Sequence, residues 1–291
     1  MIYTIENDIL VAEVTDVGAE LISLRRKDNG VDYLWLGDAT YWAGHAANLF
    51  PICGRLLESK YTYRGKTYEM LLHGFTRKMP LPLVEQKADS VTFAIRADEE
   101  TLKAYPFDFT YTVTIALQGD TVRTTYGATN HGKEPMPFAF GGHPGFFVPL
   151  GGDGDFSDWY VQFEKEAKPL VMDMVECYMT ETTTPLPLDE QHRYRLHHSM
   201  FDNDAIFMKD AGHKLVLASE KSEHSVTVTF PDMQYVGFWH VSHVEAPYMC
   251  IEPWMSVAAY HGKIDDLETK RDMIHLAPGA TRTASFDVTV R

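Results

Sequence analysis

The amino-acid sequence predicts an all-β protein, built as a large antiparallel β-sandwich with few short helices. Three observations carry this prediction. Apolar and polar residues alternate with a period of two in short segments from one end of the chain to the other. These segments are rich in β-branched and aromatic residues and are bounded by Gly, Asp, Asn or Pro. Convincing amphipathic helices are few, so many strands without crossover helices must pack sheet on sheet.

The predicted strands follow one another along the whole chain. They cover residues 9–14, 19–24, 91–95, 111–117, 159–163, 214–217, 225–230 and 285–290. Turn-forming residues lie between strand-like runs at 28–30, 64–66 and 118–120. The sequence predicts one short helix, at residues 98–105, where one or two turns precede a proline.

A Gly- and Asp-rich segment at residues 151–155 is the only plausible domain boundary. The strand pattern is the same before and after it, which favours a loop within one unit. All-β folds often run past about 200 residues as a single unit. The 291 residues suffice to bury a large core and to line a deep pocket. We therefore expect one domain over residues 1–291.

The charge of the chain excludes two classes of partner. The sequence has 26 Lys and Arg against 41 Asp and Glu, a net charge of −15. A nucleic-acid backbone and an anionic membrane surface both repel an acidic protein, so we expect neither as a partner. No basic and apolar leader opens the sequence, and no stretch approaches about 18 uninterrupted apolar residues. These features predict a cytoplasmic protein.

The three cysteines are Cys53, Cys177 and Cys250, which are widely spaced and odd in number. This usage disfavours a disulfide framework or a zinc ribbon. We expect all three to be small buried thiols in a reducing compartment.

Five polar residues lie in apolar, Gly- and Pro-rich surroundings, where a charge is costly unless it has a purpose. They are Arg55, His73, His143, Asp204 and Glu252. Each alone has an ordinary explanation as a surface cation, a core histidine, a turn residue or half of a buried ion pair. Together they can bind a polyhydroxylated ring, since arginine and carboxylates pair with neighbouring hydroxyls. A glutamate base and a histidine acid can also move protons on opposite sides of one substrate.

Aromatic side chains are the second feature that a sugar site would use. Trp254 and Phe75 lie within two residues of the polar candidates, and Trp239 lies in another apolar run. Their faces can pack against the C–H face of a sugar ring, so we include all three as candidate substrate-binding residues.

A metal-dependent enzyme is a rival interpretation, since His240, His243 and Glu245 lie close together among 13 histidines. On a strand, however, a spacing of three places His240 and His243 on opposite faces, which disfavours a shared ion. Three further histidines lie in a polar stretch and are predicted at the surface: His192, His197 and His198.

The sequence resembles the aldose 1-epimerase (galactose mutarotase) superfamily and, within it, the bacterial LacX-like branch. The motifs that carry the resemblance follow the family's order over nearly the whole chain. No single motif is decisive, but the ordered set is specific. The motifs are Gly18-Ala19-Glu20-Leu21, Phe50-Pro51-Ile52-Cys53-Gly54-Arg55-Leu56, Leu72-His73-Gly74-Phe75, His143-Pro144-Gly145-Phe146, Asp204-Ala205-Ile206-Phe207 and Ile251-Glu252-Pro253-Trp254.

The resemblance implies a one-domain β-supersandwich and interconversion of the α and β anomers of an aldose. It implies that Glu252 takes the proton from the C1 hydroxyl, that His143 protonates the ring oxygen and that His73 assists at the ring. Arg55 and Asp204 match the residues that bind sugar hydroxyls. Ring opening and reclosure consume no residue, so we expect no metal and no cofactor.

The chain departs from the better-characterised mutarotases beside the predicted site. It has His143-Pro144-Gly145-Phe146 where they carry His-x-Tyr-Phe, and Pro253-Trp254 follows Glu252 in place of a Thr-Gln type pair. Both changes retain the acid and the base. They leave open whether galactose or glucose is preferred.

Two alternative functions stay open at this point. One is a mutarotase of a phosphorylated hexose, for which Arg55, Arg77 and Lys78 would supply a basic patch. The other is a sugar-binding or sensor protein on the same fold, because a fold does not fix a function. The oligomeric state also stays open, with a homodimer as one possible assembly.

Overall fold

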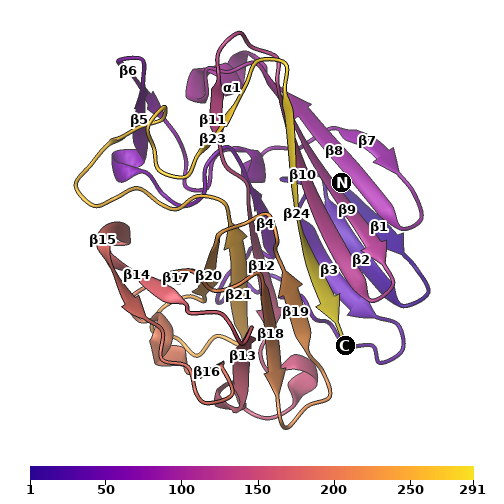
Figure 1. Ribbon diagram of the computed structural model, residues 1–291. Helices are drawn as coiled ribbons and strands as arrows, with labels where there is room; N and C mark the ends of the chain where they lie inside the picture. Colours follow the sequence, from indigo (N-terminus) through magenta and orange to yellow (C-terminus); the bar gives the residue numbers. More distant parts are fainter.

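The computed structural model describes residues 1–291 and confirms the all-β prediction (Figure 1). The strands form five sheets, and the strand pairs within them are antiparallel except for one. A single short segment is α-helical. None of the helices is long and apolar enough to cross a membrane.

The largest sheet has nine strands and forms one layer of the sandwich. Its strands are β7 (Leu83–Gln86), β8 (Ser90–Arg96), β9 (Phe109–Gln118), β10 (Thr121–Asn130), β13 (Trp159–Phe163), β16 (Arg193–Arg195), β18 (Lys214–Ser219), β19 (Val226–Thr229) and β24 (Thr281–Val290). Their order is β16-β13-β18-β19-β24-β10-β9-β8-β7. The C-terminal strand β24, yellow in Figure 1, therefore joins the two halves of this sheet.

A seven-stranded sheet forms the facing layer. Its strands are β4 (Ala46–Leu49), β12 (Gly141–Phe147), β14 (Leu170–Val175), β15 (Tyr178–Pro185), β17 (Ile206–Lys209), β20 (Tyr235–Trp239) and β21 (Tyr248–Trp254). Their order is β15-β14-β17-β20-β21-β12-β4. Nearly every residue of β4, β12 and β21 is buried, so these strands carry no polar alternation.

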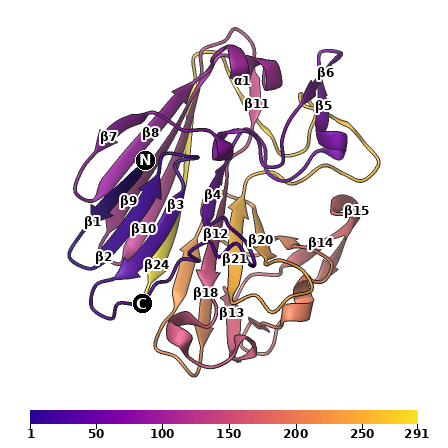
Figure 2. The ribbon, with the colours of Figure 1, turned by 180° about the vertical axis from the view of Figure 1, so that it is seen from behind.

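Three small sheets complete the fold. Their strands are β1 (Ile2–Glu6), β2 (Leu10–Thr15) and β3 (Leu21–Arg26); β5 (Lys60–Tyr63), β6 (Lys66–Glu69) and β22 (Asp265–Asp266); and β11 (Met136–Phe138) with β23 (Ile274–Leu276). Figure 2 shows β1, β2 and β3 beside β8 and β9 of the large sheet. The pair of β22 with β5 is the one parallel pairing.

The predicted helix is present as α1 (Glu99–Ala104). It begins where the Asp98 side chain accepts hydrogen bonds from the backbone N–H groups of Glu100 and Thr101. Short 3₁₀ segments occur in the connections. They are η1 (Leu57–Ser59), η2 (Thr76–Lys78), η3 (Leu150–Gly152), η4 (Phe156–Asp158) and η5 (His198–Phe201).

The core fills the space between the two large sheets. Phe238 of β20 contacts Phe163 of β13 with ring centroids 6.0 Å apart. Gly142 of β12 lies so close to β24 that an added Cβ would be 2.7 Å from the Phe286 ring. Aromatic side chains dominate around Phe50, whose ring stacks on that of Tyr111 with centroids 4.4 Å apart. Burial of these large rings is the main source of stability.

A close backbone contact fixes the segment that carries one candidate site residue, His73. Gly74 has φ +76°, and a Cβ on it would lie 2.0 Å from the carbonyl oxygen of Phe50. Gly74 also forms an isolated bridge with Phe50. Only glycine tolerates both this left-handed backbone and this approach. The contact holds the His73 segment against the chain that leaves β4.

We expect Gly74→Ala to lower the free energy of unfolding by about 2–4 kcal/mol, because strain at positive φ adds to overlap with Phe50. The matched control is Gly65→Ala, since Gly65 has φ +74° but nothing within 4 Å of an added Cβ. The control should lose only about 1 kcal/mol. Urea unfolding of both variants measures the difference, and equal losses would contradict the packing argument.

Candidate active site

One cavity collects all five polar residues that the sequence singled out. Arg55, His73, His143, Asp204 and Glu252 line a cavity of about 210 Å³. That volume equals about seven water molecules at ~30 Å³ each, which is room for one small ring. The cavity lies against the seven-stranded sheet and is closed by the segments around residues 54–77 and 174–179.

The sheet register brings two of these residues face to face. In the antiparallel pair of β12 and β21, Gly141 faces Trp254 and Gly145 faces Cys250. This register places His143 opposite Glu252. The imidazole Nε2 of His143 lies 3.3 Å from Oε1 of Glu252.

Burial changes the protonation of this pair. It raises the pKa of Glu252 well above its usual value, with a smaller contribution from the negative charge of Asp204. Burial also lowers the pKa of His143 to about 4. Both shifts favour the uncharged forms, so the single proton of the pair is held by Glu252 beside a neutral His143. A carboxylate and an imidazole that share one proton can accept and donate protons at neighbouring positions.

His73 is held by the backbone of the segment that also carries Arg55. The N–H of Gly54 donates to Nδ1 of His73 at 3.1 Å, and the N–H of His73 donates to the carbonyl of Gly54 at 2.8 Å. Burial lowers the pKa of His73 well below its usual value, and the positive charge of a protonated His143 lowers it further. Neutral His73 therefore carries its proton on Nε2, where it is available as a donor.

Arg55 and Asp204 form the more exposed side of the cavity. Arg55 Nη2 lies 3.7 Å from Asp204 Oδ2, and the two side chains are 41 % and 26 % exposed. Such a long and partly exposed pair contributes little to stability. Both groups therefore remain available to a ligand. Cys177, which the sequence did not single out for this site, also lines the cavity.

Two of the three predicted aromatic residues line the cavity, and the third does not. Trp239 and Trp254 are lining residues. Phe75 instead lies in the core, where its ring packs against Phe50 and Phe109. Its backbone follows His73 by two residues, but the turn at Gly74 directs the Phe75 side chain away from the cavity, so its proposed contact with substrate is not supported.

Trp42 is a cavity residue that the sequence analysis missed. Its ring lies 5.1 Å from that of His143 and 5.5 Å from that of Trp239. Trp42 belongs to an irregular segment, so neither alternation nor a motif marks it. The residue type was the one available indication, because a tryptophan in a loop contributes little to stability unless its side chain packs against other residues.

Glu20 holds the segment that carries Trp42. Its Oε1 accepts hydrogen bonds from the backbone N–H groups of His45 and Ala46, at 2.8 and 2.9 Å. Burial opposes the charge on Glu20, but these bonds and the nearby His45 side chain lower its pKa overall. Glu20 lies in the first family-like motif of the sequence, and its contacts give that motif a structural role.

The histidines behind the metal-enzyme interpretation do not converge. His240 is buried, and its Nε2 lies 3.1 Å from Nδ1 of His198. His243 is exposed and contacts Asp202 at 3.3 Å. Of the three histidines predicted at the surface, His197 is exposed and His192 and His198 are partly exposed. His198 stacks on the Phe156 ring with centroids 4.0 Å apart.

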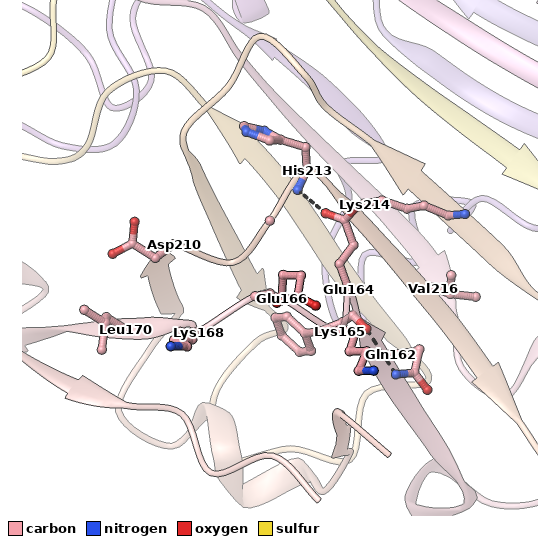
Figure 3. Close-up of a pocket in the computed structure, with 13 residues that line it drawn as sticks. Gln162, Glu164, Lys165, Glu166, Lys168, Leu170, Asp210, His213, Lys214 and Val216 are labelled. Carbon is pink, nitrogen blue, oxygen red and sulfur yellow. Dashed lines mark hydrogen bonds between the residues drawn. The ribbon is translucent and has the colours of Figure 1, made fainter. Parts of the chain in front are cut away.

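A larger and more open hollow, of about 1090 Å³, lies elsewhere, between residues 162–170 and 210–216 (Figure 3). Six of its 13 lining residues are charged, and Glu164 accepts a hydrogen bond from the backbone N–H of His213 at 2.7 Å. None of the five candidate residues lines this hollow. The smaller cavity, with its buried acid–base pair, is therefore the candidate active site.

Comparison with known proteins identifies the family of the chain. The family model described as aldose 1-epimerase matches residues 1–289. The chain belongs to the aldose 1-epimerase family. The chromosomal protein LacX of Lactococcus lactis subsp. lactis is 31 % identical to it over 299 residues, which cover 100 % of this chain and 99 % of LacX. The family and branch predicted from the motifs are thus confirmed.

Solved structures of family relatives share the whole fold. A galactose mutarotase related enzyme from Lactobacillus acidophilus is 32 % identical, with a TM-score of 0.95, and the match covers 100 % of this chain and 97 % of that one. A galactose mutarotase-like protein from Lactobacillus casei is also 32 % identical, with a TM-score of 0.93 and 100 % coverage of both chains. The sandwich is therefore the fold of these aldose 1-epimerase relatives.

We expect Glu20→Ala to lower the free energy of unfolding by about 2–4 kcal/mol, because two backbone N–H groups of the Trp42 segment lose a charged acceptor. Glu20→Gln keeps an acceptor oxygen and should lose less. The control Glu13→Ala removes an exposed carboxylate from β2 and should change stability by less than about 0.5 kcal/mol. Urea unfolding measures all three, and a Glu20→Ala value equal to the control would contradict the assigned role.

Proposed function

We propose that the protein interconverts the α and β anomers of a hexose by acid–base opening and closing of the ring. The observation that carries the proposal is the buried contact of 3.3 Å between His143 and Glu252 in a cavity sized for one ring. Membership of the aldose 1-epimerase family supports the same reaction class. The acid and base lie on adjacent strands, so the sheet itself fixes their separation.

The single proton of the pair suffices for the reaction. The two pKa shifts place the resting proton on Glu252, so the reaction starts from the form in which that proton has moved to His143. The Glu252 carboxylate then takes the proton of the C1 hydroxyl while the bond between C1 and the ring oxygen breaks. His143 then gives its proton to that oxygen. Glu252 ends protonated, His143 ends neutral and the sugar is an open aldehyde. Rotation about C1–C2 and the reverse transfers close the ring on the other face, each group contributing about 10²–10⁴-fold.

The other polar residues would hold the sugar during these steps. The Nε2–H of His73 is free to donate to the ring region, because Nδ1 is already occupied by Gly54. Arg55 and Asp204 present a donor and an acceptor at the exposed side of the cavity. We assign these two to the sugar hydroxyls. Trp239, Trp254 and Trp42 offer aromatic faces for the C–H groups of the ring.

The rival function is sugar binding without catalysis. Binding requires hydrogen-bond partners and aromatic faces, but it does not require a buried carboxylate beside an imidazole. Burying Glu252 costs free energy, and a site that only binds sugar has no need for this cost. This cost favours the enzyme over the sensor.

Glu252→Gln should lower kcat/KM for anomer exchange by at least about 10²-fold, because the amide cannot accept the C1 proton. Sugar affinity should change by only a few-fold, since the side chain keeps its size. Exchange of free hexoses followed by NMR, with the spontaneous rate subtracted, measures the first quantity. Calorimetric titration with the same sugars measures the second.

The matched control is Glu245→Gln, which makes the same change at an exposed position outside the cavity and should leave exchange unaffected. Normal anomer exchange by Glu252→Gln would overturn the proposed mechanism. Sugar binding by the wild-type protein without faster exchange would favour the sensor.

A specific observation supports a second substrate class, a phosphorylated hexose. Arg77 lines the cavity, and burial lowers its pKa although the negative charge of Glu20 opposes this. Its Nε donates to the carbonyl of Leu72 at 3.1 Å, while no carboxylate lies within ion-pair distance of its guanidinium. A half-buried arginine without a partner anion can bind an anionic group of the substrate.

If the substrate is phosphorylated, Arg77→Met should lower kcat/KM for a 6-phosphorylated hexose by about 10–100-fold and that for the free hexose by much less. Lys78→Met is the matched control, because Lys78 is the adjacent cation but is exposed and does not line the cavity. NMR measurement of anomer exchange with free and phosphorylated hexoses gives kcat/KM for both variants. Equal losses on both sugars would exclude the phosphate-binding role.

Other sequence-based expectations remain predictions. We propose that residues 1–291 act as one domain, because the five site residues come from distant parts of the chain. Cytoplasmic location and a homodimer stay predictions.

A further inference from the structure

A third side chain lies beside the acid–base pair and has no part in the proposed reaction. Cys250 is fully buried on β21, two residues before Glu252, so both side chains lie on the same face of the sheet. The ligand atoms of His143, Cys250 and Glu252 all lie within 4.8 Å of one another. We propose that these three residues form a binding site for a thiophilic divalent cation of the zinc class, and that the bound cation inhibits the enzyme. The inhibition rests on the proposed function, whereas the binding does not.

The register of the sheet builds this arrangement without any loop. Cys250 faces Gly145 on β12 and Trp239 on β20, and His143 lies two residues before Gly145, on the same face of the sheet. Three donors thus come from two adjacent strands of one sheet. Sites on strands are held more precisely than sites on loops.

The distances suit a small tetrahedral ion. Zinc lies about 2.0–2.2 Å from nitrogen and oxygen ligands, so tetrahedral angles place these two ligand atoms about 3.3–3.5 Å apart. The Nε2 and Oε1 atoms are 3.3 Å apart. Zinc–sulfur bonds of about 2.3 Å require a sulfur roughly 3.6 Å from the nitrogen and from the oxygen. Sγ lies within 4.8 Å of both atoms, so it has to approach them by about 1 Å at most. A change in the Cys250 side-chain torsion can supply a shift of this size.

The charges of such a complex balance. A divalent cation bound by a carboxylate, a thiolate and a neutral imidazole has zero net charge, which suits a buried site better than any of these ions alone. On binding, the S–H bond of Cys250 breaks and the proton shared by His143 and Glu252 is also released, so two protons leave to solvent while sulfur, carboxylate and imidazole bond to the metal. Nδ1 of His143 has no hydrogen-bond partner in the protein, so the ring is free to turn toward the ion.

Three protein ligands leave one position of a tetrahedral ion open. His143 and Glu252 line the cavity, so that position can take a water molecule or a sugar hydroxyl. The cation would occupy the lone pairs that the acid and base need. Zinc should therefore block anomer exchange by competition for the pair.

The ordinary alternative is that Cys250 only fills space. It belongs to a small apolar cluster with Trp35, Ala246 and Tyr248. A thiol used for packing alone would bind no cation together with His143. The two roles differ in a direct binding measurement, which requires no substrate.

The test compares Cys177→Ala with the double variant Cys177→Ala/Cys250→Ala, both freed of metal by a chelator. The first substitution removes the partly exposed thiol of the cavity from both proteins. Titration with Co²⁺ in the absence of sugar should give a thiolate-to-cobalt absorption of one equivalent in the first protein and none in the second. Circular dichroism checks that both are folded, and Cys250→Ser replaces Cys250→Ala should the latter unfold.

Zinc titration of anomer exchange completes the test. The zinc concentration for half-inhibition should rise at least about 10-fold when Cys250 is absent, with activity before zinc addition retained. Absence of a thiolate band in the Cys250-containing protein, or equal zinc inhibition of both proteins, would overturn the site. If the protein catalyses no anomer exchange, the cobalt band still reports on the site, so failure of the proposed function is distinguishable.

Discussion

The structure depends on one constraint, the antiparallel register of β12 and β21. It sets a carboxylate opposite an imidazole, 3.3 Å apart, on the face of the seven-stranded sheet that lines the cavity. A slip by one residue would turn His143 toward the opposite sheet and leave Glu252 buried without it. Burial of an ionisable pair costs free energy, and the aromatic core around Phe50 supplies the stability that tolerates this cost. The stability of the two sheets thus permits shifted pKa values at a buried acid–base pair.

Sequence patterns predict the outer parts of this fold better than its centre. The strands β9, β13 and β24 alternate between buried and half-buried residues, and their positions were predicted to within a few residues. The strands β12 and β21 are buried on both faces, so they show no alternation and were not predicted as strands from their pattern. The sheet that carries the site was therefore the part of the fold that periodicity predicted least well.

The residues of the candidate site were easier to predict from the sequence than the strands that carry them. In strands without alternation, a charged residue among apolar neighbours is easy to recognise. Glu252 and His143 were identified in this way. Convergence of five such residues on one cavity agrees with that reasoning. Side-chain direction was harder to predict, because it depends on local φ. The left-handed backbone at His73 and Gly74 directs His73 to the cavity and Phe75 to the core. The residues around them did not allow these two side-chain directions to be predicted.

Net charge says little about the field inside the cavity. The chain carries −15 overall, yet two guanidinium groups, those of Arg55 and Arg77, line a cavity whose carboxylates are Asp204 and Glu252. Burial keeps a proton on the His143–Glu252 pair, so this pair adds no net negative charge. The local balance is then positive, against the sign of the whole molecule. Local desolvation, rather than total charge, thus decides which ligands the site accepts.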